Sequence, residues 1–328
     1  MQKKCLIGFD GYTDEVYRPV CKYEGGKPLL WKSMKDFGTS LSDMEGRNAD
    51  IPILPVSNRC GGNAPLMAGA IAALGIETCC IGMFDNCPML PAQVQNRADW
   101  ISIGPCNRCI ALEFSDGKLM LSHLESFHMT WKDLIEKIPQ SRLEQLLQAS
   151  DLFAVVNWSA FLHMNEILEH IEQLLRHLAQ RKILFFDLAD FSARSSEDVR
   201  QLILILQTLS ARHHVVLGLN QKESELLGRK YYETSLNKEQ VGKRLADDLA
   251  GATIVIHSRT EAECWHGPEY FLRKAFVISH PKILTGSGDH FNAGFCCGIL
   301  KHMSLEDSLA LGNRAAGYYI SHGTDLEE

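Results

Sequence analysis

The sequence predicts an α/β protein with a doubly wound, mainly parallel sheet and helices on both faces. Short apolar runs typical of buried strands recur along the 328 residues, and segments with apolar residues at helical period lie between them. Such alternation favours a parallel sheet, because each helix carries the chain back across one face of it. Polar residues follow several of the apolar runs, at the sheet edge where parallel sheets bind ligands.

The individual elements follow from these patterns. The predicted strands are Lys4–Phe9, Thr78–Met83, Leu152–Trp158, Lys182–Leu188, His214–Leu219 and Thr253–His257. The predicted helices are Ala64–Leu74, Met164–Leu178, Glu197–Leu209, Lys238–Leu249 and Leu305–Ser321, together with a helix-compatible run from His290 to Ile299. The polar residues placed at the carboxyl ends of strands are Asp14, Asn157, Asp187 and Asn220.

Two regions break this alternation. Residues 109–121 read as a hairpin, with Asp116-Gly117 as a two-residue turn between extended arms. Residues 16–56 begin and end with short extended pieces, and the polar stretch 23–50 between them is interpreted as a surface insertion. For that stretch, disorder, a short helix around Trp31–Phe37, and contact with a substrate or second subunit all stay open.

The composition excludes several kinds of partner. The formal net charge is −7 and the sequence pI is about 6.0, so the chain lacks the basic field that attracts nucleic acid. Apolar runs such as Leu202–Leu206 are too short to cross a bilayer, and no secretory signal is evident at the N-terminus. We therefore expect neither a nucleic-acid nor a membrane partner. Residues 324–328 read as a solvated tail.

The chain contains 11 cysteines, an odd number, spread from Cys5 to Cys297. Several lie in apolar runs, where a reduced thiol behaves as a small hydrophobic side chain. This usage indicates a reducing compartment and predicts a cytoplasmic protein. Cys106 and Cys109 form a Cys-x-x-Cys pair, and no zinc site is expected there, because no second pair follows at matching spacing.

The most specific local pattern is Thr285-Gly286-Ser287-Gly288-Asp289, preceded by Leu284. The Gly-Ser-Gly turn lets the backbone approach a ligand closely and presents amide N–H groups at a helix start, where an anion binds well. The carboxylate that follows places a base beside that anion, which suits the attack of a hydroxyl on a phosphoryl group. Helix capping alone also explains glycine and aspartate at such positions.

Three further segments accompany this turn. Gly8-Phe9-Asp10-Gly11-Tyr12-Thr13-Asp14 follows the first apolar run, Arg59-Cys60-Gly61-Gly62-Asn63-Ala64-Pro65 opens a small-residue helix, and Asn220-Gln221-Lys222-Glu223 follows another strand. In this order and spacing the four segments resemble the PfkB (ribokinase-like) family of carbohydrate and nucleoside kinases. The resemblance implies ATP-dependent phosphorylation of a hydroxyl on a small sugar-like substrate, by a single ribokinase-like domain over residues 1–328.

The resemblance also implies catalytic roles. Asp289 matches the family's general base, which takes the proton of the attacking hydroxyl. The amides from Gly286 to Gly288 match its anion hole, which neutralises charge on the transferring phosphoryl group. Asn220 and Glu223 match the motif that organises Mg²⁺, largely through water molecules, and Mg²⁺ commonly keeps several waters.

Binding residues and a lid follow from the same resemblance. The substrate side is expected to comprise Asp14 as acceptor for a substrate hydroxyl, with Asp10, Gly61, Gly62, Asn63 and Asn157. The nucleotide side is expected to comprise Asn220, Thr285, Gly286, Gly288, Asn313 and Arg259. A small β-sheet lid is expected from residues 14–58 and 105–128, closing over the substrate and excluding water. Relatives often pair through this lid, so a homodimer is a further expectation.

The sequence departs from the family pattern at three points. Leu66 stands where many relatives carry Asn after the double glycine, which makes Asn63 the candidate sugar contact. Ile283 stands where members activated by a monovalent cation carry Asp, and no potassium dependence is expected because an apolar side chain cannot ligate potassium. The loop His257–Glu261 lacks the usual glycine-rich turn along ATP, which leaves Arg259 as either a phosphate contact or a solvated charge.

The sequence leaves the acceptor open. A neutral sugar is favoured because nothing in the expected pocket is basic enough to select an acidic one, although Arg18, Lys35, Arg97 and Arg108 lie in or near the lid segments. A nucleoside kinase of the same family and a non-catalytic sugar-binding relative are the alternatives. A dinucleotide-binding oxidoreductase is disfavoured, since the turn after the first strand lacks Gly-x-Gly-x-x-Gly.

Overall fold

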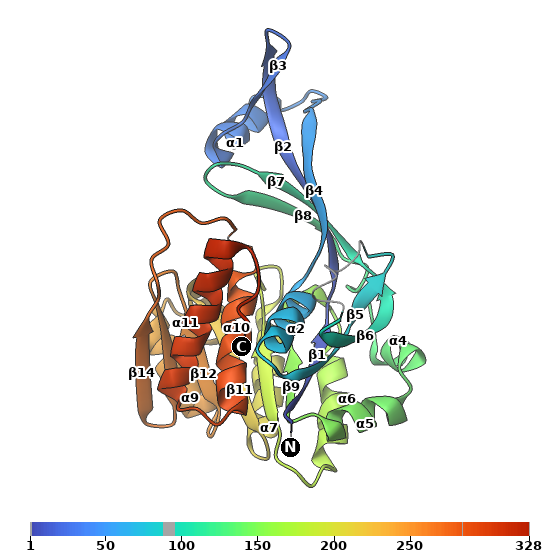
Figure 1. Cartoon of the computed structure of the whole chain (residues 1–328), viewed down its shortest axis with the longest axis vertical. Helices are drawn as coiled ribbons and strands as arrows, with labels where there is room; N and C mark the ends of the chain where they lie inside the picture. Colours follow the sequence, from blue (N-terminus) through green and yellow to red (C-terminus); the bar gives the residue numbers. More distant parts are fainter. Residues whose placement is uncertain (1, 88–95, 284, 328) are drawn as a thin grey trace.

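Two β-sheets organise the chain, a large one inside a layered body and a smaller one that projects away from it (Figure 1). The computed structural model describes residues 2–87, 96–283 and 285–327. In the described residues the large sheet has nine strands, in spatial order β14 (Glu269–Lys274), β13 (Glu261–His266), β12 (Thr253–His257), β11 (His214–Asn220), β10 (Ile183–Asp187), β9 (Leu152–Val155), β1 (Lys4–Phe9), β5 (Glu77–Asp85) and β6 (Ala98–Pro105).

The large sheet is parallel from β6 to β12, and the antiparallel strands β13 and β14 complete one edge. The chain leaves β1 for β5 on one side and later returns to β9 on the other side. This reversal of direction opens a crevice at the carboxyl ends of β1 and β9, which is where sheets of this type hold ligands. The prediction of a doubly wound, mainly parallel sheet is confirmed.

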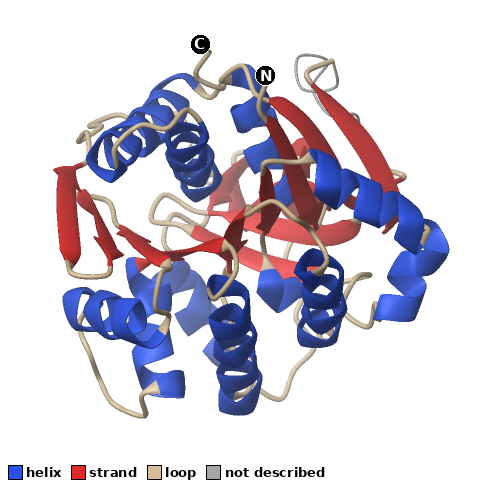
Figure 2. Ribbon diagram, turned by 90° about the horizontal axis from the view of Figure 1, so that it is seen from below, coloured by secondary structure: helices blue, strands red, loops and turns tan. Residues whose placement is uncertain are grey.

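Helices cover both faces of this sheet (Figure 2). One hydrophobic core is shared with α4 (Trp131–Lys137), α5 (Gln140–Ala149), α6 (Met164–Arg176), α7 (Ser196–Ser210), α8 (Gln221–Tyr231) and α9 (Lys238–Asp248). The other core is shared with α2 (Asn63–Ala73), α10 (Ser287–Leu300) and α11 (Leu305–His322). Neighbouring residues of β1 alternate between the two cores, Leu6 in the first and Ile7 in the second, as a strand buried on both faces requires.

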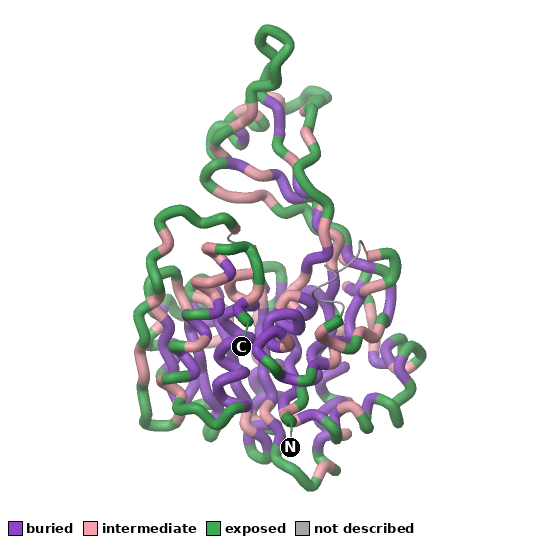
Figure 3. Tube along the Cα trace, viewed as in Figure 1, coloured by how far each residue is buried: buried purple, intermediate pink, exposed green. Residues whose placement is uncertain are grey.

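The small sheet contains β2 (Tyr12–Glu24), β3 (Lys27–Leu30), β4 (Ile53–Gly61), β7 (Asn107–Glu113) and β8 (Lys118–His123). Helix α1 (Met34–Ser42) packs Phe37 against Leu112 and Phe114, which gives this sheet a small core of its own. Buried residues concentrate in the layered body, whereas the outer end of the small sheet is largely exposed (Figure 3). The expected second sheet is therefore present, and the 23–50 stretch forms part of it.

Several expectations on individual elements are confirmed and two are corrected. Strands β1 and β12 have the predicted bounds. Strand β9 ends at Val155 rather than at residue 158, because Asn157 adopts a left-handed conformation with φ 56° and Trp158–Ala160 form a 3₁₀ turn. The hairpin β7–β8 exists, but its turn is longer than two residues, since Glu113 pairs with Lys118.

Asp116, in this turn, has a partner outside the hairpin. Its carboxylate oxygens accept hydrogen bonds from the backbone N–H of Met34, at 3.0 and 3.2 Å. Met34 begins helix α1, whose N-cap residue is Ser33. The short helix considered around Trp31–Phe37 is present, although it starts three residues later and extends to Ser42. Among the helices of the described ranges, none is both long enough and apolar enough to span a bilayer.

Candidate active site

Asp10 lies directly after β1 and is completely buried. Its carboxylate accepts hydrogen bonds from the backbone N–H groups of Asn63 (2.9 Å) and Ala64 (2.7 Å), which are otherwise unpaired at the start of α2. It also accepts one from the side-chain amide of Asn157, at 2.7 Å. Burial raises the pKa of Asp10 to about 6, while these three hydrogen bonds oppose the shift. The residue thus joins the end of β1, the start of α2 and the loop after β9.

The double glycine Gly61-Gly62 directly precedes α2 and lies close to two carboxylates. A Cβ atom on Gly61 would lie 2.4 Å from Oδ2 of Asp14, a distance that no side chain tolerates. Gly62 has φ 107°, which favours glycine, and a Cβ atom there would lie 3.2 Å from Oδ2 of Asp10. These glycines therefore let the backbone pass between two carboxylates.

Asp14 belongs to the small sheet rather than to the end of β1. It is the third residue of β2 and is 7 % exposed, and its backbone is registered opposite Arg59 of β4. Burial raises the pKa of Asp14, and the positive charges of Arg59 and Lys118 oppose that shift. A largely buried carboxylate with a guanidinium beside it is well suited to hold a polyhydroxylated ligand, because both groups form charge-assisted hydrogen bonds.

Asp289 lies in the first turn of α10, three residues after the N-cap Gly286. Gly286 has φ 95°, and a Cβ atom there would lie 3.0 Å from Leu66 Cδ1, so the turn requires glycine. The Asp289 side chain is 8 % exposed. Burial raises the pKa of Asp289 well above its usual range, the negative charges of Asp187 and Asp10 raise it further, and a hydrogen bond with Asn63 opposes the shift.

Asn220 and Glu223 form a capping box at the start of α8. Glu223 accepts hydrogen bonds from the backbone N–H of Asn220 (2.8 Å) and from its side-chain amide (2.6 Å), and Asn220 accepts one from Glu223 N–H. Burial, with the negative charge of Asp187, raises the pKa of Glu223 to about 8. The structural role of helix capping is therefore confirmed for this motif, and it positions a buried carboxyl group near the crevice.

The residues present fit Mg²⁺ bound through water. Asp10, Asp187, Glu223 and Asp289 interact repulsively, and burial raises the pKa of each. A cation would relieve that repulsion. In the described part of the chain, no three acidic, histidine or cysteine side chains converge closely enough to hold a metal directly. Oxygen ligands at longer range suit Mg²⁺, because it keeps much of its water shell.

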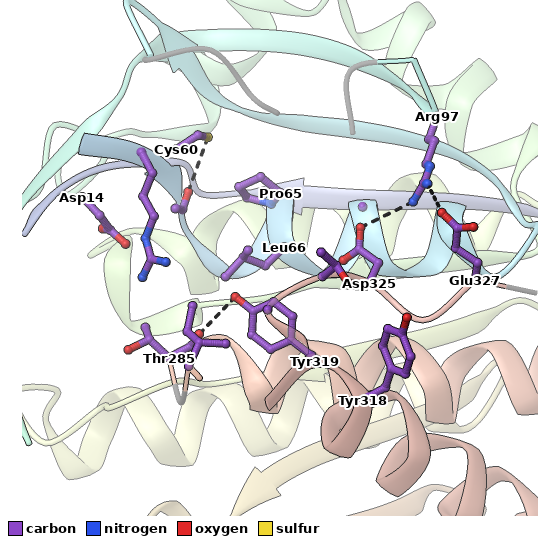
Figure 4. Close-up of a pocket in the computed structure, with 16 residues that line it drawn as sticks. Asp14, Cys60, Pro65, Leu66, Arg97, Thr285, Tyr318, Tyr319, Asp325 and Glu327 are labelled. Atoms are coloured by element: carbon purple, nitrogen blue, oxygen red, sulfur yellow. Dashed lines mark hydrogen bonds and ion pairs between the residues drawn. The ribbon is translucent and has the colours of Figure 1, made fainter. Parts of the chain in front are cut away.

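A cavity of about 430 Å³ opens between β4, α2 and α11, and its lining includes none of these four carboxyl groups. Its walls include Arg59 and Gly61. Figure 4 shows Asp14 at one end of the cavity with Thr285 near it, and Tyr319 and Asp325 further along. Its volume is in the range of small-molecule sites. Gly61 and Asp14 link this cavity to the substrate side predicted from the sequence, and Thr285 links it to the turn before Asp289.

Three residues of this region were not identified from the sequence. Arg59 lines the cavity beside Asp14, and the only signal for it was its position before the double glycine. His257 lies at the end of β12, where a Cβ atom on Gly288 would be 3.4 Å from its ring, and burial lowers the pKa of His257 to about 4. Tyr319 of α11 donates a hydrogen bond to the carbonyl of Thr285, at 3.3 Å. Their contacts join distant parts of the sequence.

The residues expected on the nucleotide side are less tightly grouped. The side-chain amide of Asn313 donates to the carbonyls of Arg273 (3.3 Å) and Lys274 (3.2 Å), at the end of β14. Arg259 is exposed on the turn between β12 and β13, next to Thr260, whose carbonyl accepts from Ala275 N–H. Both residues therefore lie near the end of β14. Leu284, named with the Gly-Ser-Gly turn, lies outside the described residues.

The basic residues noted in or near the lid are mostly paired with acids. Arg18 pairs with Glu113 at 3.0 Å and Arg108 with Glu15 at 3.0 Å, both within the small sheet. Arg97 pairs at 2.5 Å with Glu327 near the end of the described chain. The expectation of a solvated tail is wrong for part of residues 324–328, because Leu326 is 8 % exposed within the second hydrophobic core.

Comparison with known proteins agrees with this geometry. The family model of prokaryotic ketohexokinase matches residues 1–327. A ketohexokinase of Haloferax volcanii is 23 % identical over 329 residues, which cover 98 % of this chain and 88 % of that protein.

Solved structures share the fold at low sequence identity. Adenosine kinase from Sinorhizobium meliloti has a TM-score of 0.69 at 17 % identity, covering 97 % of this chain and 94 % of that one. Ribokinase from Cryptococcus neoformans var. grubii serotype A, in complex with ADP, has a TM-score of 0.66 at 13 % identity, covering 98 % and 94 %. These likenesses show the ribokinase-like fold. The chain belongs to the prokaryotic ketohexokinase family and is a carbohydrate kinase that uses an alcohol group as acceptor.

Proposed function

We propose that the enzyme transfers the γ-phosphoryl group of ATP to a hydroxyl of a ketohexose-like sugar, with Asp289 as the general base. The observation that carries this proposal is the buried Asp289 carboxyl group in the first turn of α10, directly after a glycine-only N-cap turn. The free amides of that turn suit the developing phosphoryl charge, and the raised pKa of Asp289 makes it a stronger base once ionised.

The chemistry follows from these positions. Asp289 takes the proton of the sugar hydroxyl as that oxygen forms a bond to the γ-phosphorus, and the bond from the γ-phosphorus to the bridging oxygen of ADP breaks. The N–H groups of Gly286, Ser287 and Gly288 stabilise negative charge on the three peripheral oxygens. Mg²⁺, when bound near Glu223 and Asn220 through water, supplies charge neutralisation between the phosphates.

On the substrate side, we propose that Asp14 and Arg59 bind sugar hydroxyls, while Gly61 and Gly62 let the sugar lie against the backbone. Asn63 and Asn157 complete this side. Asp10 acts mainly through them, because its oxygens already accept three hydrogen bonds from the protein. On the nucleotide side, we propose that Asn220, Thr285, Asn313 and Arg259 surround ATP, in support of which a ribokinase of this fold has been solved with ADP.

The test measures ADP release from Mg-ATP with a panel of ketohexoses, other sugars, sugar acids, sugar phosphates and nucleosides. We expect a ketohexose to give the largest kcat/KM. Asp289→Asn should lower kcat by about 10²–10⁴-fold with an unchanged circular dichroism spectrum, because it removes the base and little volume.

Other outcomes of the panel are informative. A nucleoside as best acceptor would replace the substrate class and leave the chemistry intact. Sugar binding without ADP release would indicate a non-catalytic relative, and near-normal turnover of Asp289→Asn would refute the role of the base.

We further propose that residues 14–58 and 105–128 act as a lid on one ribokinase-like domain, and that two copies pair through it. Exposed apolar side chains on the small sheet support pairing, among them Val56, Ile110 and Leu121. We also propose a cytoplasmic location, supported by the burial of Cys5, Cys80 and Cys264 in a hydrophobic core, where a reduced thiol behaves as a small apolar side chain.

A further inference from the structure

His290 follows the proposed base and is 1 % exposed. Its Nδ1 atom lies 2.7 Å from the carbonyl oxygen of Gly286, and its Nε2 atom lies 2.9 Å from Oδ1 of Asp325. The ring stacks on Tyr319, with centroids 3.6 Å apart and planes inclined by 15°. Each ring nitrogen therefore faces an acceptor, one on the Gly-Ser-Gly turn and one near the end of the described chain.

A count of protons decides the charge of this ring. A backbone carbonyl can only accept, and an ionised carboxylate can only accept, so both ring nitrogens must donate. A neutral imidazole has one N–H and would point a lone pair at one of the two oxygens. We propose that His290 is held as a buried imidazolium behind the anion-binding turn, with Asp325 as its counter-ion.

The other groups around the ring agree with this charge. Arg97, which precedes β6, lies 3.6 Å from Oδ2 of Asp325, so that carboxylate is shared between two cations. Burial raises the pKa of Tyr319 to about 12, which keeps the stacked phenol neutral. Its aromatic face is a favourable neighbour for a cation. Figure 4 shows Arg97 reaching toward Asp325, with Tyr319 on the neighbouring helix.

The contacts of His290 also orient the proposed anion hole. This part of the inference rests on the function proposed above. In a trans peptide the C=O and N–H groups point in opposite directions. Since the Gly286 carbonyl is held by the His290 ring and by the His290 backbone N–H (3.1 Å), the N–H of Ser287 points the other way, out of the helix start. His290 is thus a positioning residue for the proposed amide cradle, and it adds one positive charge behind it.

The charge is tested by nitrogen-15 NMR of the full chain at pH 7.5, without ligands. The His290→Gln variant identifies the His290 ring signals by their absence. We expect both ring nitrogens to show the shifts of protonated nitrogen. One protonated and one bare nitrogen would overturn the proposal. This readout does not depend on phosphorylation, so it stands even if the proposed sugar or base is wrong.

Kinetics test the consequence. In Asp325→Asn the amide can donate to Nε2, so the ring can be neutral and keep its Nδ1 hydrogen bond to Gly286. We expect kcat to fall about tenfold with less than a twofold change in sugar KM, a smaller loss than for removal of a direct anion-hole donor.

The matched control is His322→Gln. His322 also stacks on a tyrosine (Tyr318, 4.1 Å) and bonds the carbonyl four residues earlier, but it is exposed and is the last residue of α11. We expect wild-type kinetics for this control. If Asp325→Asn keeps the wild-type kcat while NMR shows a neutral His290, the charge of His290 does not contribute to catalysis.

Discussion

The carboxyl groups of the crevice are more basic than ordinary carboxyl groups, since burial and mutual repulsion raise the pKa of Asp10, Glu223 and Asp289. A general base is active only when ionised. With Asp289 as the proposed base, kcat/KM should therefore increase as pH rises through the pKa of Asp289. Burial therefore raises the proton affinity of the carboxyl group that we propose as the base.

This reasoning predicts the pH profile of kcat/KM. We expect the acid limb to lie well above the ordinary carboxyl pKa near 4, because the Asp289 pKa is raised. Glu223→Gln removes one of the negative charges that raise it and should move the limb to lower pH. The profile is measured with Mg-ATP and the best acceptor between pH 5 and 9. A wild-type profile that stays flat down to pH 5 would contradict the assignment.

At the scale of elements, a segment could be predicted from the sequence when its pattern of apolar residues lies within the segment itself. Strand β1 was recognised as a short continuous apolar run, and helix α9 by apolar residues at helical period. The strands β13 and β14 were missed, since their side chains range from buried to exposed without a clean alternation. The glycine-rich turn of the site was also predictable, whereas Arg59 and Tyr319 were not, because their contacts join distant segments.

Helix α8 allows a test that separates capping from charge. Glu223→Gln keeps a capping-box residue at the third position of the helix, so α8 should begin at the same residue. The Glu223 pKa of about 8 in the folded state exceeds its unfolded value, so the folded protein binds the extra proton. Stability should therefore rise as pH falls from 8.5 to 7, by about 1 kcal/mol for the ligand-free protein.

Urea unfolding at the two pH values measures this difference. In Glu223→Gln we expect the dependence to shrink, because the titrating group is gone. If the pH dependence of the unfolding free energy is unchanged in the variant, another group takes up the proton. Addition of Mg²⁺ with nucleotide should also reduce it, since a bound cation favours the ionised carboxylate.

At the scale of the whole molecule, the small sheet carries apolar side chains that the layered body does not cover. Ile110 of β7 and Leu121 of β8 are cross-strand neighbours, exposed to 38 % and 52 %. Burial of such a pair between two copies would contribute to association through the hydrophobic effect.

The proposed dimer is tested by one substitution. We expect Ile110→Glu to shift sedimentation velocity at micromolar concentration from dimer to monomer, because it places a charge in the apolar contact. The control Leu204→Glu alters a side chain of α7 that is 62 % exposed on the layered body, and should leave the dimer intact. Identical sedimentation of both variants and the wild type would argue against pairing through the small sheet.

Asp14 and Arg59 belong to strands of the small sheet, whereas Asp289 belongs to a helix of the layered body. In the proposed mechanism, sugar binding and proton removal are therefore assigned to separate parts of the structure. Without a bound sugar, and with these two parts of the structure apart, the proposed base has no hydroxyl to deprotonate. We expect the sugar-free enzyme to spare ATP from wasteful hydrolysis until a sugar draws the two parts together.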